Sequence, residues 1–210
     1  MEQILLSSSE VSLAKSHATL MELGGKSFRD KDSRKENLSL DQLVGALGEM
    51  AFSIYLTGSK HAWELTRRAR NTCIGVGDDG EDLLGLNVDV KTSLVRSISR
   101  PIWEYNLAVR PAELRDGTVY VLALVTKLSF EQREFTSEES PGWQTDDGAT
   151  VNLMGWAERE DLPLSPNSSG TFAGAYSLPA NGLNRLPSFR WLGDKSNAVR
   201  HEDNRSDGPN

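Results

Sequence analysis

The chain has 210 residues, of which 38% are hydrophobic and 25% are charged, so it can bury one sizeable core or two small ones. It contains no apolar run of about 18 residues and no basic, apolar start of the signal-peptide kind, so we expect a cytoplasmic protein that does not associate with a membrane. The net charge of −7 argues against nonspecific coating of nucleic acid, and the single cysteine, Cys73, excludes an internal disulfide.

Two helices are predicted in the first third of the chain. Apolar residues at helical spacing predict a helix over residues 8–23, which ends at a Gly-Gly pair. The polar residues 26–37 that follow show no apolar period and are predicted as a loop. A stronger pattern over residues 39–57 begins with Ser39 and Gln42 at capping-box spacing and is closed by Gly58.

A series of strands is predicted next. The first four cover residues 62–66, 72–77, 82–84 and 88–95, and the last two of these are joined by a tight hairpin. Residues 103–109 alternate between apolar and polar, whereas residues 118–125 are apolar throughout, as in a central strand covered on both faces. The last predicted strand covers residues 150–157. This order indicates an α/β fold with a mixed central β-sheet flanked by helices.

The remainder of the chain is expected to be irregular. We predict a single domain over residues 1–193, with its core at about 39–157, followed by a disordered tail over residues 194–210, which has too little apolar surface to order itself.

An unusual group of charges lies in the segment GDDGEDLLGLNVDVKTS, residues 77–93. In a strand over residues 88–95, Asp89 and Lys91 share one face with Ser93, and the hairpin brings Asp82 to the same end. Carboxylates gathered in this way suit a hard cation such as Mg²⁺ or Mn²⁺. The alternative interpretation is a turn rich in aspartate, followed by an Asp89–Lys91 ion pair on a solvated strand.

The second helix contributes a further acid. Glu49 lies beside Gly48 and one turn after Gly45, and each interior glycine costs about 1 kcal/mol relative to alanine. Glycines at these positions would let another part of the backbone approach, so that Glu49 points towards a sheet edge and supports the cation site.

The motifs GALGEMAF, GEDLLG and NVDVKTS together resemble the PD-(D/E)XK nuclease superfamily, which has a restriction-endonuclease-like fold. The resemblance covers about residues 39–156. It implies that Asp82 and Asp89 are metal ligands, that Lys91 is the catalytic lysine and that Glu49 is the helix glutamate. Glu81 stands where the family commonly has proline, which leaves the choice between Asp79 and Asp82 open.

The expected function is therefore that of a Mg²⁺- or Mn²⁺-dependent nuclease, and a DNA endonuclease is the form that we favour. Lys91 would position or deprotonate the attacking water, or neutralise the transition state. Nine Lys or Arg residues lie within residues 60–115, and the arginines expected to contact the phosphate backbone are Arg67, Arg68, Arg70 and Arg96.

A second class of function stays open, namely a nuclease-like fold that does not cleave and instead binds nucleic acid or protein. Residues 131–161 carry nine acids against two basic residues, which would repel DNA and could dock a protein partner. The sequence does not distinguish DNA from RNA, and it leaves open whether the chain forms a homodimer.

Overall fold

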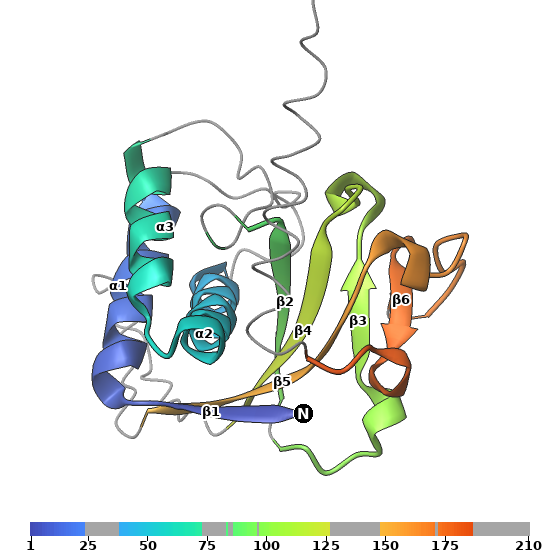
Figure 1. The fold of residues 1–210 in the computed structure, drawn as a ribbon, viewed down its shortest axis with the longest axis horizontal. Coiled ribbons are helices and arrows are strands. Elements are labelled where there is room, and N and C mark those ends of the chain that lie inside the picture. Colours follow the sequence, from blue (N-terminus) through green and yellow to red (C-terminus); the bar gives the residue numbers. More distant parts are fainter. Residues whose placement is uncertain are drawn as a thin grey trace, which may run out of the picture.

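The computed structural model describes residues 1–23, 38–72, 83, 86–95, 97–126, 148–170 and 172–186. Three helices, α1 (Ser8–Leu23), α2 (Leu38–Thr57) and α3 (His61–Thr72), lie on one side of the sheet, with α2 against it and α1 and α3 outside α2 (Figure 1). Within the described residues none of these helices is long and apolar enough to span a membrane.

A mixed four-stranded sheet forms the middle layer, with the strand order β1-β5-β4-β2. Its strands are β1 (Glu2–Leu6), β2 (Val88–Leu94), β4 (Val119–Thr126) and β5 (Ala149–Ala157). Strand β2 runs parallel to β4, whereas the β4–β5 and β5–β1 pairs are antiparallel. The prediction of a mixed sheet flanked by helices is therefore confirmed.

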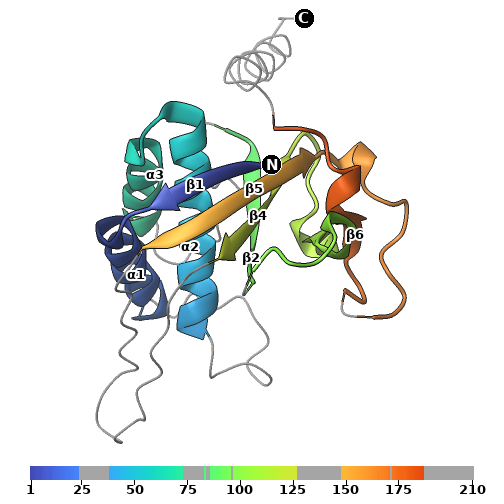
Figure 2. The same ribbon diagram turned by 90° about the horizontal axis from the view of Figure 1, so that it is seen from below.

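A small antiparallel sheet of β3 (Asn106–Val109) and β6 (Tyr176–Pro179) lies on the other side of the main sheet, where β3 packs on β4 and β2 (Figure 2 shows β6). Short 3₁₀ turns flank it, of which η2 (Ile102–Glu104) precedes β3 and η3 (Pro111–Glu113) follows it. The chain therefore passes from β2 to β4 by way of β3, which lies on the face of the main sheet opposite the helices.

Strand β4 joins two hydrophobic cores because its side chains alternate between the two faces of the sheet. Val119, Val121, Ala123 and Val125 pack into a core shared with the helices. Tyr120, Leu122 and Leu124 pack into a second core shared with β3. All eight residues of β4 are buried, which confirms the prediction of a central strand covered on both faces.

Helix α2 lies between the sheet and the other two helices, so it is buried on nearly every side (Figure 1). Leu43, Leu47 and Ala51, at helical spacing on one side of α2, are buried, and so are Met50 and Phe52 on its other sides. A polar residue in the middle of α2 consequently points into protein rather than into solvent.

The prediction of a strand over residues 62–66 is wrong, because these residues belong to helix α3. Among residues 61–68 of this helix, whose side chains the structure describes, Trp63, Thr66 and Arg67 are buried, at the spacing i, i+3, i+4. Two of these three side chains are polar or charged, so the apolar pattern of the sequence did not reveal the helical period.

Three smaller differences concern the strands. Only residues 106–109 of the predicted strand 103–109 belong to a strand, and Trp103 in η2 is exposed. Strands β1 and β6 were not expected, because each is too short to show a period. Of the predicted hairpin, the described part is an isolated bridge between Leu83 and Leu86, with Leu86 N donating to Leu83 O at 3.0 Å.

Candidate active site

The candidate site begins on strand β2, whose residues alternate as predicted. Val88 and Val90 are buried against the helices. Asp89 and Lys91 pair in register with Tyr120 and Leu122, so they lie on the opposite face, towards β3. Asp89 Oδ2 and Lys91 Nζ are 2.8 Å apart, which confirms the expected juxtaposition.

A third charged group, Glu113, joins this pair from the turn η3. Its Oε2 lies 3.0 Å from Lys91 Nζ, so one ammonium lies between two carboxylates. The side chains of Asp89 and Lys91 are only 14% and 21% exposed, whereas that of Glu113 is 39% exposed. The cluster Asp89–Lys91–Glu113 is therefore reached from solvent on the Glu113 side.

The position of Glu113 depends on Tyr120, a fully buried residue of β4. The Tyr120 hydroxyl donates to the Glu113 carbonyl oxygen at 3.0 Å and accepts from Arg115 N at 2.7 Å. Arg110 N donates to Glu113 Oε2 at 3.2 Å and closes the turn from its other end. The turn is thus fixed to the sheet beside β2.

Sequence reasoning missed Glu113. The tetrapeptide Arg-Pro-Ala-Glu after a strand is typical of a capped turn, because Pro suits the first turn position and an acid three residues after the cap can accept from its backbone N–H. That signal predicts a turn but does not indicate which strand the acid faces. Only the parallel pairing of β2 with β4 brings η3 next to Lys91.

The charges of the cluster alter each other's pKa values. Burial lowers the pKa of Lys91, but the Asp89 and Glu113 carboxylates oppose burial, and the pKa ends above its usual 10.5. Burial raises the pKa of Glu113, but the Lys91 ammonium and the Arg110 backbone N–H more than offset it, and the pKa ends below 4.5. Both groups are therefore charged at neutral pH.

The sheet and helix α2 meet closely behind the cluster. A Cβ atom on Gly48 would lie 2.8 Å from Thr92 Cγ2 and 3.0 Å from Thr92 Cβ, both closer than packed carbon atoms approach. The expectation that glycine in α2 allows a close approach therefore holds at Gly48. It does not hold at Gly45, because a Cβ atom there would have no neighbour within 4 Å among the described residues.

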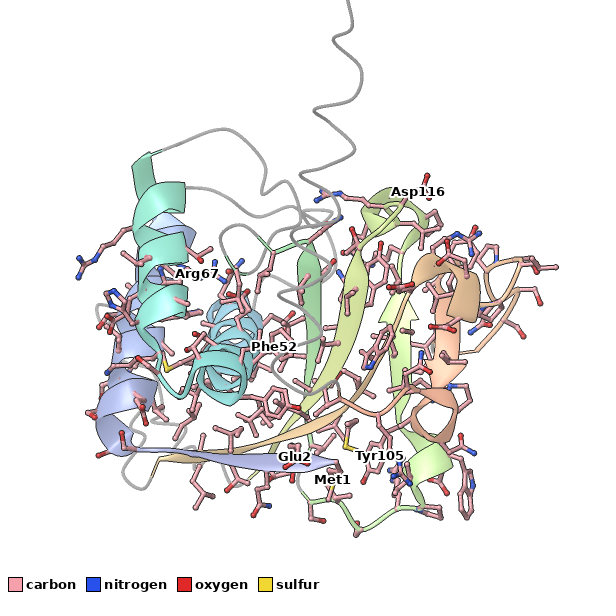
Figure 3. The ribbon with its side chains drawn as sticks, viewed as in Figure 1. Met1, Glu2, Phe52, Arg67, Tyr105 and Asp116 are labelled. Atoms are coloured by element: carbon pink, nitrogen blue, oxygen red, sulfur yellow. The ribbon has the colours of Figure 1, made fainter. Side chains whose placement is uncertain are left out.

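Glu49 lies in the helical layer and not beside Asp89. It forms an ion pair with Arg67 of α3, and both residues are buried, with exposed fractions of 9% and 7%. The guanidinium carbon of Arg67 also lies 5.9 Å from the centre of the Trp63 ring. Figure 3 shows Arg67 reaching from α3 towards α2. Within the described residues, no three Asp, Glu, His or Cys side chains form a group that could hold a metal ion.

The remaining predicted site residues have different positions. Arg68 is exposed on α3, next to the buried Arg67. Arg70 belongs to α3 as well. Asp82, its alternative Asp79, and Arg96 lie outside the residues that the structure describes.

Comparisons of this chain with protein-family models, with curated proteins and with solved structures found no match.

Proposed function

We propose that the chain is a metal-dependent nuclease of the PD-(D/E)XK type, with a restriction-endonuclease-like core built on α2 and β2. The observation that carries the proposal is the contact between Asp89 and Lys91 on one face of β2. A carboxylate and an ammonium at this spacing on a strand match the D-x-K motif, in which the acid binds a cation and the lysine acts on the scissile phosphate.

The described residues include an oxygen ligand of the kind that a hard cation binds. Asp89 supplies carboxylate oxygens, the ligands that Mg²⁺ and Mn²⁺ prefer, and it already lies against a positive charge. Asp82 is the second ligand in this proposal. A bound Mg²⁺ would lower the pKa of a coordinated water and stabilise charge on the phosphoryl group.

Lys91 acts in this proposal as a hydrogen-bond donor and a fixed positive charge. Its ammonium has three N–H groups, and two of them serve Asp89 and Glu113. The third can donate to a phosphate oxygen or to a water molecule. An ammonium held between two carboxylates suits neutralisation of the transition state better than removal of a proton.

The phosphate backbone would approach from the side of η3. Arg110 is exposed and Arg115 is half-buried at the two ends of this turn, so positive charge flanks the cluster. Arg68 is exposed as well, but it lies on α3, on the opposite side of the sheet from this cluster, so it does not flank the cluster. Arg67 is not part of this surface, because it is buried and paired with Glu49.

The test is cleavage of plasmid, linear duplex and single-stranded DNA with and without Mg²⁺ or Mn²⁺. We expect cleavage that needs a divalent cation and that Asp89→Asn abolishes. Ser93→Ala is the matched control, because Ser93 follows Asp89 and Lys91 on the same face of β2 but is exposed. Absence of cleavage on every substrate, or equal cleavage by Asp89→Asn, would refute the proposal.

The second candidate is a nuclease-like fold that binds without cleaving. The pairing of Glu49 with Arg67 favours it, because the helix glutamate is then engaged away from Asp89. This candidate predicts that nucleic acid or protein binds equally well to wild type and to Asp89→Asn, with no cleavage by either.

A further inference from the structure

We propose that Glu113 is the positioning residue for Lys91, a role that lies outside the D-x-K motif and rests on the proposed nuclease function. Its contact with Lys91 Nζ at 3.0 Å nearly equals that of Asp89 at 2.8 Å. The two carboxylates reach the ammonium from different elements, β2 and η3.

The role follows from what Asp89 would do when a cation binds. A carboxylate that coordinates Mg²⁺ has less electron density to offer to an ammonium beside it. Lys91 is a flexible side chain on four methylene groups, so it would lose its position if Asp89 were its only partner. The Glu113 carboxylate would still hold the Lys91 ammonium, because Glu113 is not part of the D-x-K motif and does not bind the cation in this proposal.

Glu113 is suited to this because the turn that carries it is fixed. Its carbonyl oxygen is held by the buried Tyr120 hydroxyl, and its carboxylate accepts from Arg110 N as well as from Lys91. Hydrogen bonds in which one partner is charged are shorter and stronger than neutral ones, so the carboxylate both closes η3 and restrains Lys91. Glu113 lies against the lysine rather than the reacting atoms, so its role is positioning.

The variant Glu113→Gln separates this role from simple closure of the turn. Glutamine keeps an oxygen that can accept from Arg110 N, but it removes the negative charge that faces Lys91. The matched control is Asp116→Asn, which makes the same change of charge at the exposed tip of the same loop (Figure 3). Circular dichroism checks that each variant is folded, and Glu113→Ala replaces Glu113→Gln if the glutamine variant does not fold.

The first measurement needs neither metal nor substrate. In ¹⁵N-labelled protein, the side-chain ammonium of Lys91 is observed by NMR, since hydrogen bonds slow the exchange of its protons with water. We expect a resolved Lys91 signal in wild type and in Asp116→Asn, and loss of this signal by exchange in Glu113→Gln. An unchanged signal in Glu113→Gln would overturn the inference.

The second measurement is cleavage at saturating Mg²⁺. Loss of one charge-assisted hydrogen bond should lower kcat about tenfold while KM for DNA and the Mg²⁺ affinity stay within about twofold. A change in KM alone would overturn the positioning role. If wild type itself fails to cleave DNA, the proposed nuclease function fails, whereas the NMR result still decides whether Glu113 positions Lys91.

Discussion

Two groups of ion-paired side chains lie on opposite sides of the sheet, and they differ in net charge. Glu49 and Arg67 form a buried pair between α2 and α3, with one carboxylate for one guanidinium. Asp89, Lys91 and Glu113 form a cluster with two carboxylates for one ammonium, and it is partly open to solvent. The pair carries no net charge, whereas the cluster carries one surplus negative charge, which in the proposed function would attract a cation.

In our proposal the two groups have different roles, a structural one for the Glu49–Arg67 pair and a functional one for the Asp89–Lys91–Glu113 cluster. The resemblance groups Glu49 with Asp89 and Lys91, but the structure places Glu49 in the helical layer and Glu113 beside the lysine. We therefore expect substitutions at the pair to act on stability and, under the proposed nuclease function, substitutions at the cluster to act on cleavage. Five experiments test this distinction.

The largest expected effect is on the buried pair. Arg67→Ala leaves the Glu49 carboxylate buried without its partner, and such changes cost about 3–5 kcal/mol of unfolding free energy. Urea denaturation measures it. The neighbouring, exposed Arg68→Ala is the matched control and should change stability by less than about 0.5 kcal/mol. Equal effects at both positions would show that the pair is not buried in solution.

The apolar double variant Glu49→Leu with Arg67→Met tests whether the Glu49–Arg67 pair is structural. It removes both charges together, so it should recover most of the stability that Arg67→Ala loses. If this double variant is folded and still cleaves DNA, Glu49 is structural. If it is folded but fails to bind Mg²⁺, Glu49 belongs to the metal site after all.

The second effect is on cleavage. Lys91→Ala should lower the cleavage rate about a hundredfold, the usual scale for loss of a charge-stabilising group. The rise in thermal midpoint on adding Mg²⁺ should persist, because a ligand that binds only the folded state stabilises it by mass action and Asp89 is still present. Cleavage at the wild-type rate would show that Lys91 is only a surface charge.

The third effect compares two glycines of one helix. Gly48→Ala should destabilise the fold by about 1–3 kcal/mol, because its new methyl group overlaps Thr92 on β2. Gly45→Ala has open space and should instead stabilise the helix by up to about 1 kcal/mol. Thermal and urea denaturation of both variants test this contrast, and similar changes at both sites would contradict the close contact of α2 with β2.

The smallest effect is the pH dependence that Glu113 adds to stability. Its pKa is lowered in the folded chain, so the carboxylate stabilises the fold above its ordinary pKa of 4.5 and stops doing so as pH falls through the lowered value. The stability difference between wild type and Glu113→Gln should therefore be constant near pH 7 and shrink below pH 4.5. A difference that persists at the lowest pH would mean that the charge of Glu113 is not involved.

The parts of the fold that could be predicted were those with a clear local pattern. Helices α1 and α2, strands β2, β4 and β5, and the shared face of Asp89 and Lys91 all follow from local patterns, either a period or, for β4, an unbroken apolar run. Helix α3 was missed because its buried face includes Thr66 and Arg67, whose polarity conceals the helical spacing. Arg67 is buried against Glu49 of α2, and a short stretch of sequence around α3 does not contain that contact.

The side-by-side placement of a carboxylate and an ammonium on a strand could be read from the sequence, because alternation along a strand is a property of the backbone. Which other charges join them depends on how the elements pack. Glu113 reaches Lys91 because β2 and β4 are parallel neighbours, and Glu49 turns to Arg67 because α2 is enclosed by α3 and the sheet. These partners are far apart in the chain, and packing of the elements brings them together. The spacing of residues along the sequence therefore does not predict them.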